Sequence, residues 1–339
     1  MMPANLTPAY KAAEKAYRRA REPAEQLECL REMLREIPKH KGTDHLQADI
    51  KTRIKEVTQE LAAPRKTGGG GPPTVFRPEG AGQIALVGPP NTGKSTLHDR
   101  LTGSHAATGP YPFTTQFPQP GMMPVEDIAF QLIDLPAVSA EHPVPWLANA
   151  LQPADACLLI VDVTRPDCIE QVTAVPSLLG ERQVSLTRSW PVDAGDGDDL
   201  EDHDPFSVTL PTLLVATKGD LMDDAEGEVA TFRDLAGLDL PTRIVSASTG
   251  DGLASLGEWL FRHLGVVRVY TKIPGRPADM GRPFCLRTGE TVLDVARLVH
   301  KEVAASFRYA RLWGGGEFDG QQVGAEHVVA DGDVLEMHT

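Results

Sequence analysis

The segment that decides the fold is Gly88-Pro89-Pro90-Asn91-Thr92-Gly93-Lys94-Ser95-Thr96, which fulfils the spacing GxxxxGK[ST]. It follows an apolar run at residues 84–87 and precedes a stretch that predicts a helix. Glycines let the main chain approach a ligand closely, and the positive end of the helix attracts anions, so this loop can wrap phosphate groups. Lys94 is expected to reach the β- and γ-phosphates, and the Ser95 hydroxyl to hold Mg²⁺. The sequence therefore predicts a nucleotide-binding P-loop.

Outward from this loop, short apolar runs alternate with helical segments. Strand-like runs lie at residues 84–87, 131–134, 156–163, 212–217 and 242–245. Their nearly continuous apolar character indicates burial on both faces, which is typical of parallel strands joined by helical crossovers. We therefore expect a doubly wound α/β domain with a mostly parallel sheet over residues 82–265.

A second motif addresses the choice of base. Thr217-Lys218-Gly219-Asp220 follows an apolar strand and resembles the guanine-reading [NT]KxD element of the small GTPase superfamily. Asp220 would accept two hydrogen bonds from guanine, and an unpaired carboxylate would disfavour other bases. Ser246-Ala247-Ser248 resembles the loop that closes over the guanine ring. Taken alone, TKGD is equally explained by a surface turn, but its place two strands after the P-loop favours guanine recognition.

Two further elements are expected to sense the γ-phosphate. Thr114 and Thr115 lie where the same superfamily places the threonine that caps Mg²⁺, and the sequence does not choose between them. Asp134 occupies the first position of a DxxG element and would bind Mg²⁺ through water. The sequence departs from that element at Ala137, which stands in place of glycine and restricts the backbone turn that switching requires.

The residue after this element bears on hydrolysis. Val138 stands where many relatives of Ras carry a water-orienting glutamine, so the expected rate is slow, on the order of 10⁻⁴ to 10⁻² s⁻¹. Several GTPases with such substitutions carry asparagine at the P-loop position of Asn91 and bind K⁺ there. Asn91 is therefore a K⁺ ligand candidate, with a side chain that only stabilises the loop as the alternative.

The ends of the chain differ from its middle. Residues 1–63 contain three amphipathic stripes that predict a helical hairpin or small bundle, and residues 64–81 read as a flexible linker with four consecutive glycines. Residues 1–66 carry 14 Lys/Arg and 10 Asp/Glu, whereas residues 67–265 carry 10 and 27. Any contact with nucleic acid should therefore run through the ends of the chain, with a solvated helix surface as the alternative.

The last segment, residues 266–339, alternates strand-like runs with one expected helix at 292–307 and predicts a small α+β fold. The four cysteines have no CxxC spacing, which argues against a disulfide framework or a zinc site. Residues 193–204 are acidic and are expected to form a solvated loop rather than a metal site. No run of eighteen apolar residues and no signal peptide is evident, so we expect a cytoplasmic protein without membrane insertion.

Both ends of the chain resemble one family. The segments concerned are Pro3-Ala4-Asn5-Leu6, Ile37-Pro38-Lys39-His40-Lys41-Gly42-Thr43, Leu46-Gln47-Ala48-Asp49, Val269-Tyr270-Thr271-Lys272, Pro274-Gly275, His300-Lys301, Phe307, Tyr309-Ala310 and Trp313-Gly314. They resemble the N-terminal helical region and the C-terminal TGS domain of the developmentally regulated GTP-binding (DRG) proteins of the Obg superfamily. The resemblance fails between about residues 137 and 211, where the glycine-rich segment and the inserted small domain of DRG proteins are not evident.

This resemblance implies a ubiquitin-like β-grasp TGS domain and an association with ribosomes, RNA or translation proteins through the two terminal modules. Lys272, Arg276 and Arg282 would meet phosphates, although residues 266–339 balance 9 Lys/Arg against 10 Asp/Glu. The favoured interpretation is a GTP-binding protein with slow Mg²⁺-dependent GTP hydrolysis. The alternative is a nucleotide-dependent scaffold with negligible turnover, and a P-loop kinase is a remote third class because it leaves TKGD unexplained.

Overall fold

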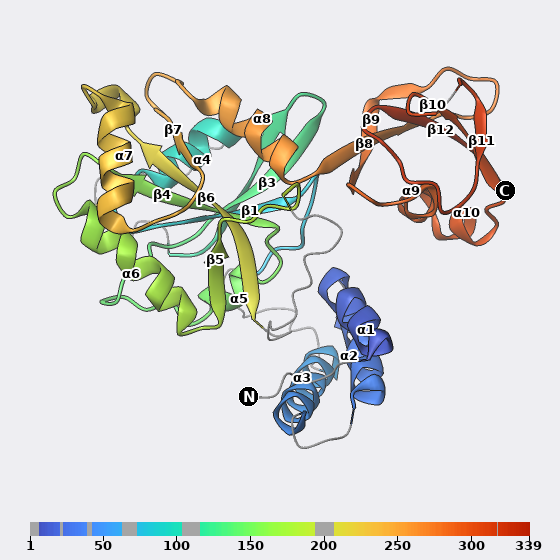
Figure 1. The fold of residues 1–339 in the computed structure, drawn as a ribbon, viewed down its shortest axis with the longest axis horizontal. Helices are drawn as coiled ribbons and strands as arrows, with labels where there is room; N and C mark the ends of the chain where they lie inside the picture. Colours follow the sequence, from blue (N-terminus) through green and yellow to red (C-terminus); the bar gives the residue numbers. More distant parts are fainter. Residues whose placement is uncertain are drawn as a thin grey trace. The chain divides into compact units, whose positions relative to one another are not determined.

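The computed structural model describes residues 7–20, 23–38, 43–62, 73–103, 116–193, 207–316 and 318–339. Internal contacts divide the chain into a helical unit within residues 1–73 and a larger unit that contains residues 74–198 and 208–339 (Figure 1). Within the described part of the chain, no helix combines the length and the apolar character needed to cross a membrane.

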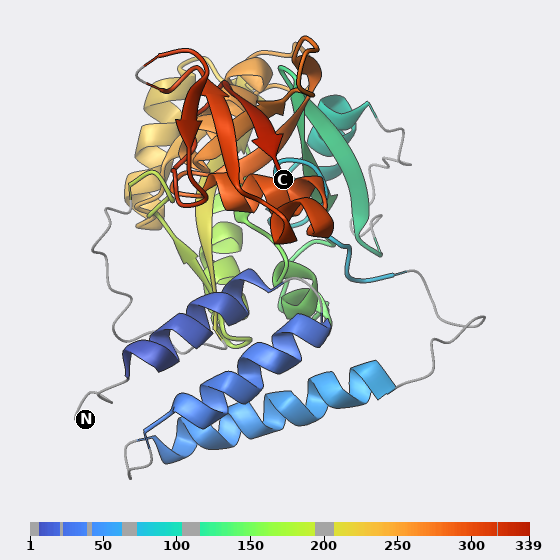
Figure 2. The same cartoon turned by 90° about the vertical axis from the view of Figure 1, so that its right-hand side faces the viewer.

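The helical unit consists of α1 (Pro8–Arg19), α2 (Pro23–Glu36) and α3 (Asp44–Ala62), which Figure 2 shows lying alongside one another. Thr7 caps α1 by accepting a hydrogen bond from the Tyr10 amide, and its hydroxyl donates to the carbonyl oxygen of Glu36 at 3.2 Å. All of the buried core residues except Met33 come from the three predicted apolar stripes: Tyr10, Ala13, Tyr17, Leu27, Leu30, Met33, Ile37, Ile50 and Val57. The unit therefore has a core of its own.

The larger unit begins with a seven-stranded sheet. Its strands are β1 (Gln83–Val87), β2 (Gln119–Val125), β3 (Ile128–Asp134), β4 (Ala156–Asp162), β5 (Val184–Thr187), β6 (Val208–Thr217) and β7 (Thr242–Ile244). The order is β2-β3-β1-β4-β6-β5, and β7 pairs with β6. Only β2 is antiparallel to its neighbour, β3. The carboxyl ends of the parallel strands therefore meet at one edge of the sheet, where ligands bind in such folds.

Helices cover both faces of this sheet, as Figure 1 shows. One face packs against α5 (Leu147–Leu151), α6 (Cys168–Gly180) and α7 (Ala225–Ala236), and the other against α4 (Lys94–Thr102) and α8 (Leu253–His263). The two apolar layers are separate clusters with β1, β4 and β6 between them. The predicted doubly wound α/β architecture is confirmed.

Two strands differ from the sequence-based expectation. The strand β2 carries Pro120, Gly121 and Pro124, which disfavour a central strand, but it lies at the sheet edge where a missing N–H is tolerated. The strand β5 spans only four residues and pairs with the first part of β6, which is itself longer than predicted. Apolar periodicity did not reveal either strand because neither is continuously apolar.

The unit ends in a five-stranded mixed sheet formed by β8 (Val266–Thr271), β9 (Asp279–Arg287), β10 (Tyr309–Trp313), β11 (Gln321–Val323) and β12 (Asp333–His338). Its order is β11-β10-β12-β8-β9, with β12 and β8 parallel. One face packs on α9 (Val292–Val299) through Val292 and Val295. Only Leu264 and Gly265 separate α8 from β8, so the chain passes directly from one sheet region to the next.

The expected single helix at residues 292–307 is wrong. Helix α9 ends at Val299, and a short helix α10 (Lys301–Ala305) follows. His300 between them is extended, with φ −170° and ψ 146°, and its ring nitrogen accepts a hydrogen bond from the Glu302 amide. A side-chain cap thus starts a new helix in the middle of the apolar pattern.

Candidate nucleotide site

The P-loop joins the end of β1 to the start of α4, as its motif predicts. Gly93 precedes the helix in a left-handed conformation, with φ 84° and ψ 16°, and Asn91 is also left-handed with φ 60°. The side chain of Asn91 is exposed. The loop therefore places backbone N–H groups at the positive end of α4, where phosphates bind in P-loop proteins.

Gly88 directly follows β1 and lies close to the backbone of β4. A Cβ added to Gly88 would lie 2.4 Å from the carbonyl oxygen of Ile160, a backbone atom that cannot move independently. The carbonyl oxygen of Gly88 also accepts a hydrogen bond from the Val138 amide at 3.0 Å. The glycine is thus required by the close approach of the two strands.

We expect Gly88→Ala to destabilise the protein by about 1–3 kcal/mol because it forces extra volume into a closely packed backbone. Gly180→Ala is a matched control, because nothing lies within 4 Å of a Cβ at that position. Urea unfolding of both variants measures the difference. Equal stability of the two variants would contradict the packing argument.

Lys94 is the first residue of α4 and is buried, with 7% of its surface exposed. Its ammonium group donates a hydrogen bond to the carbonyl oxygen of Pro89 at 2.7 Å. Burial lowers the pKa of Lys94 to about 8, although the nearby Asp134 carboxylate opposes that shift. The Lys94 ammonium group is therefore folded back over the P-loop, where the phosphate groups are expected to bind.

Ser95 and Asp134 come together at the next position. The Ser95 hydroxyl donates to Asp134 Oδ2 at 2.6 Å, and Asp134 is 1% exposed at the end of β3. A hydroxyl and a carboxylate beside a phosphate loop form the hard oxygen donor set that Mg²⁺ prefers. The residues present therefore fit the predicted metal.

The guanine-type motif is fastened to the P-loop. The Thr217 hydroxyl lies 2.7 Å from the carbonyl oxygen of Thr92 and 3.1 Å from that of Val161. The Gly219 amide donates to the carbonyl oxygen of Val245 at 3.1 Å, which places the motif beside the loop that begins with Ser246. Asp220 is exposed in a single 3₁₀ turn, Gly219–Leu221.

The loop Ser246-Ala247-Ser248, which was predicted to close over the guanine ring, is held by hydrogen bonds within its own segment. Ser246 is buried and its amide donates to the carbonyl oxygen of Asp251, while Ala247 is partly exposed and Ser248 is exposed. Together with the Thr217 contacts, this arrangement brings the predicted phosphate and guanine motifs to the carboxyl ends of β1, β6 and β7.

Sequence reasoning missed Asp162. This carboxylate ends β4 and is 1% exposed. Its Oδ2 accepts a hydrogen bond from Lys218 Nζ at 2.6 Å, and its Oδ1 accepts from the amide and the hydroxyl of Thr164 at 3.1 and 2.6 Å. Lys218 itself has a left-handed backbone with φ 58°. The available signal was an acidic residue at the end of a buried apolar strand, as at Asp134.

Some of the residues in the segments expected to sense the γ-phosphate are described by the structure, and others are not. Thr114 and Thr115 lie outside the described residues. Ala137 and Val138 are buried, with 5% and 7% exposure, and Val138 packs in the core beneath the sheet. The side chain at position 138 therefore points into the protein, as expected for a residue that does not orient water.

Comparisons with known proteins agree with this arrangement. Residues 83–187 match the family described as "50S ribosome-binding GTPase", and residues 267–339 match the TGS domain. An uncharacterized GTP-binding protein of Halobacterium salinarum is 26% identical, over 92% of this chain and 98% of its own length. Developmentally-regulated GTP-binding protein 1 of Xenopus laevis is 27% identical, over 88% and 94%. Developmentally-regulated G-protein 3 of Arabidopsis thaliana is 28% identical, over 88% and 94%.

One solved structure shows the same fold. The YchF GTPase of Schizosaccharomyces pombe superimposes with a TM-score of 0.51 at 13% identity, covering 78% of this chain and 99% of that one. A GTP-binding protein of Pyrococcus horikoshii gives a TM-score of 0.48 at 16% identity, covering 76% and 99%.

Proposed function

We propose that this chain is a slow GTPase whose bound nucleotide controls a partner interaction. The premise is that the chain joins a GTPase-family domain to a TGS domain and is related over most of its length to the developmentally regulated GTP-binding proteins. Binding of GTP is the part that the relatives share. Hydrolysis, its dependence on Mg²⁺ and the partner are our inferences.

One observation carries the proposal: the hydrogen bond between the Thr217 hydroxyl and the carbonyl oxygen of Thr92, at 2.7 Å. It joins a phosphate motif and a guanine motif that are 125 residues apart in sequence. A surface turn would have no reason to bond to the P-loop. Asp220, three residues beyond Thr217, is therefore proposed to read the base, with Ser246, Ala247 and Ser248 beside it.

The roles of the remaining residues follow from their positions. Backbone amides of residues 88–96 bind the phosphates, and Lys94 neutralises the β- and γ-phosphate charge. Ser95 and Asp134, with Thr114 or Thr115, would hold Mg²⁺, which supplies further neutralisation of the phosphates when bound. We propose functional regions at residues 1–63, 82–265 and 266–339, with 64–81 as a linker.

Titration calorimetry with GDP, GTP and ATP tests the base assignment. We expect GDP and GTP to bind at least about 10⁴-fold more tightly than ATP, since a site built around hydrogen bonds rejects ligands that leave them unpaired. Equal affinity for ATP would refute guanine recognition.

A nucleotide-dependent scaffold without turnover is the second candidate, favoured by the buried Ala137 and Val138. Single-turnover phosphate release in K⁺ and in Na⁺ separates the two functions. Release faster than in buffer supports a GTPase, and an advantage of K⁺ that disappears in Asn91→Ala supports the proposed cation ligand. A rate equal to that in buffer supports the scaffold.

We expect Asp162→Asn to accelerate GDP dissociation by about tenfold, because the Lys218 ammonium loses a charge-assisted hydrogen bond and the guanine loop is held less firmly. Stopped-flow release of a fluorescent GDP analogue measures the rate. Asp167→Asn is the control, since that carboxylate binds Arg165 and Gln171 rather than the loop. Equal rates in the two variants would show that Asp162 does not position the guanine loop.

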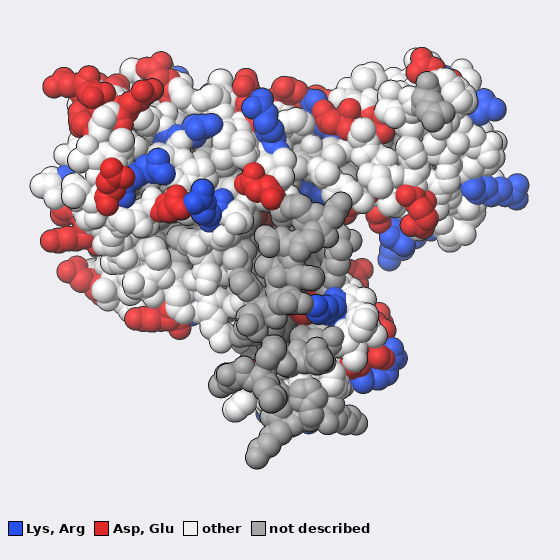
Figure 3. All heavy atoms as spheres, viewed as in Figure 1, with Lys and Arg blue, Asp and Glu red and all other residues white. Residues whose placement is uncertain are grey.

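We propose a cytoplasmic partner of ribosomal or translation-related chemistry, reached through the helical unit and the TGS domain. Residues 67–265 carry 27 Asp/Glu against 10 Lys/Arg, which disfavours nucleic-acid contact through the GTPase region. Figure 3 shows acidic side chains along the left and upper edges of its visible face, with basic side chains among them. Co-sedimentation with ribosomes in GDP and in a non-hydrolysable GTP analogue tests the proposal. Equally low recovery of the protein with ribosomes in both nucleotides would contradict the proposed ribosomal partner.

A further inference from the structure

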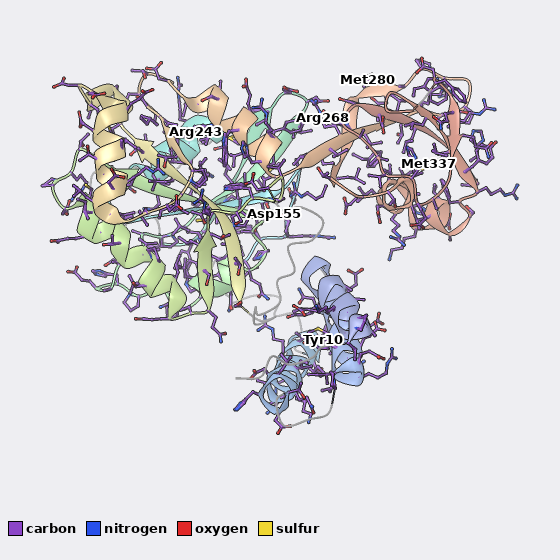
Figure 4. All side chains as sticks on the ribbon, in the orientation of Figure 1. Tyr10, Asp155, Arg243, Arg268, Met280 and Met337 are labelled. Atoms are coloured by element: carbon purple, nitrogen blue, oxygen red, sulfur yellow. The ribbon has the colours of Figure 1, made fainter. Side chains whose placement is uncertain are left out.

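Arg268 on β8 of the TGS domain contacts the turn between β2 and β3 of the GTPase domain. Its Nη1 donates to Asp127 Oδ1 at 2.9 Å and also to Glu126 Oε2. The hydroxyl of Tyr270, two residues further along the same strand, donates to Asp127 Oδ2. We call these contacts between Arg268 and Tyr270 on one side and Glu126 and Asp127 on the other the hairpin clamp (Figure 4, where Arg268 is labelled).

Arg268 is held in place without the help of the hairpin. Its amide and Nε donate to Asp331 Oδ1 at 2.8 and 3.0 Å, and its Nη2 donates to Asp331 Oδ2 at 2.8 Å. The guanidinium also lies over the ring of Phe261 in α8, 4.8 Å from its centroid. These bonds hold Arg268 against Asp331 and Phe261, so its contacts with Glu126 and Asp127 are additional to those that fix the side chain.

The clamp differs from an ordinary surface ion pair. The Arg268 side chain is 18% exposed and Tyr270 is 7% exposed. Burial alone raises the pKa of Asp127, but hydrogen bonds from Tyr270 and Arg268 outweigh it and leave that pKa below its ordinary value. The bond to Asp127 raises the pKa of Tyr270 to about 12. Partly buried, multiply bonded charges lose less to solvent screening than exposed pairs do.

A second ion pair joins the two domains elsewhere. Arg287 Nη2 on β9 lies 3.2 Å from Asp155 Oδ1, and Asp155 Oδ2 accepts a hydrogen bond from the Gln83 amide at the start of β1. This contact lies at the amino end of the central strands. That pair lies beside β1, which leads to the P-loop, whereas the hairpin clamp lies at the turn of the hairpin whose strand β3 ends at Asp134.

The hairpin links the clamp to the nucleotide site at its other end. The strands β2 and β3 pair without a register shift from Val125 and Ile128 at the turn to Gln119 and Asp134. Asp134 is the carboxylate that binds Ser95, and the predicted Mg²⁺ ligands Thr114 and Thr115 precede β2 in the chain. Seven paired residues span about 20 Å and form a continuous hydrogen-bonded connection between the clamp and Asp134.

We propose that the hairpin clamp couples the identity of the bound nucleotide to the attachment of the TGS domain. The proposal rests on the function proposed above, since it requires a guanine nucleotide at the P-loop. Coupling between sites is reciprocal: if the nucleotide biases the clamp, then breaking the clamp must change the relative affinities for the two nucleotides by the same factor.

The test compares affinities for GDP and a non-hydrolysable GTP analogue in the full chain. We expect Arg268→Ala and Asp127→Asn each to change the ratio of the two affinities by at least about fivefold. The double variant should change it no further than the larger single effect, because both substitutions break one contact. Arg311→Ala removes an exposed arginine of β10 and should leave the ratio unchanged.

Tyr270→Phe is a milder variant that should not disturb folding, since it deletes only the hydroxyl that binds Asp127. It should change the ratio of the two affinities in the same direction as Arg268→Ala, by a smaller factor. Amide hydrogen exchange of wild-type β8 in the two nucleotides gives an independent readout, with different protection expected. If the ratio of the two affinities stayed within twofold of the wild-type ratio in all clamp variants, the coupling would be wrong and the proposed function would remain. Equal amide protection of β8 with both nucleotides would have the same consequence. A wild-type chain that binds neither nucleotide overturns the proposed function and this inference together.

Discussion

Replacement of Lys94 by alanine is expected to weaken binding of GDP and GTP by about 10²- to 10³-fold and to remove measurable hydrolysis. Loss of one member of a buried charge pair typically costs about 2–5 kcal/mol, and the phosphates would face the loop without their nearest cation. The ammonium group donates a hydrogen bond to the carbonyl oxygen of Pro89 at 2.7 Å, which places this cation within the P-loop. Titration calorimetry and single-turnover hydrolysis measure the two effects.

Lys301→Ala is the control for Lys94→Ala, because Lys301 is an exposed lysine at the start of α10 in the TGS domain. Thermal unfolding separates loss of binding from loss of folding. We expect the Lys94 variant to keep a cooperative transition, since burial of a cation opposes folding and its removal offsets the lost hydrogen bond. Nucleotide affinity within fivefold of wild type would contradict the proposed role of Lys94.

Replacement of Asp220 by asparagine is expected to reverse base selectivity. Guanine presents two hydrogen-bond donors to the carboxylate, whereas xanthine carries an oxygen at C2 that suits an amide donor. We expect GDP affinity to fall by about 10⁴-fold, as for other sites whose hydrogen-bonding group no longer matches the ligand, while xanthosine diphosphate affinity rises. Titration with both diphosphates measures the exchange.

The fold should tolerate Asp220→Asn, because Asp220 is exposed in its 3₁₀ turn. Asp223→Asn makes the same chemical change three residues away at another exposed position and should leave both affinities unchanged. If the Asp220 variant retained wild-type GDP affinity, the TKGD segment would be a surface turn after all.

The parts of the fold that the sequence predicted are those encoded by contiguous residues. The P-loop is one nine-residue run, and β1 and β4 are apolar apart from Gln83 and Asp162 at their ends because both of their faces are buried. The strand β2 was missed because its prolines are tolerated only at an edge, and strand order is a long-range property. The helix after Val292 was predicted too long because the His300 side chain caps a new helix inside an apolar pattern.

In the candidate site, too, the residues that belong to contiguous motifs could be predicted from the sequence. Lys94, Ser95 and Asp134 follow from motif spacing, and the structure places the last two in contact. The partnership of Asp162 with Lys218 spans 56 residues, and that of Arg268 with Asp127 spans 141. No local pattern specifies such pairs, since they depend on which loops the sheet brings together.

The short connection between α8 and β8 sets how the hairpin clamp operates. With only Leu264 and Gly265 between these elements, Arg268 cannot diffuse away from the turn when the contact breaks. Its effective concentration at the turn is therefore on the order of millimolar or higher, as for any short covalent tether. Contacts too weak to join two separate proteins therefore suffice to keep the clamp closed.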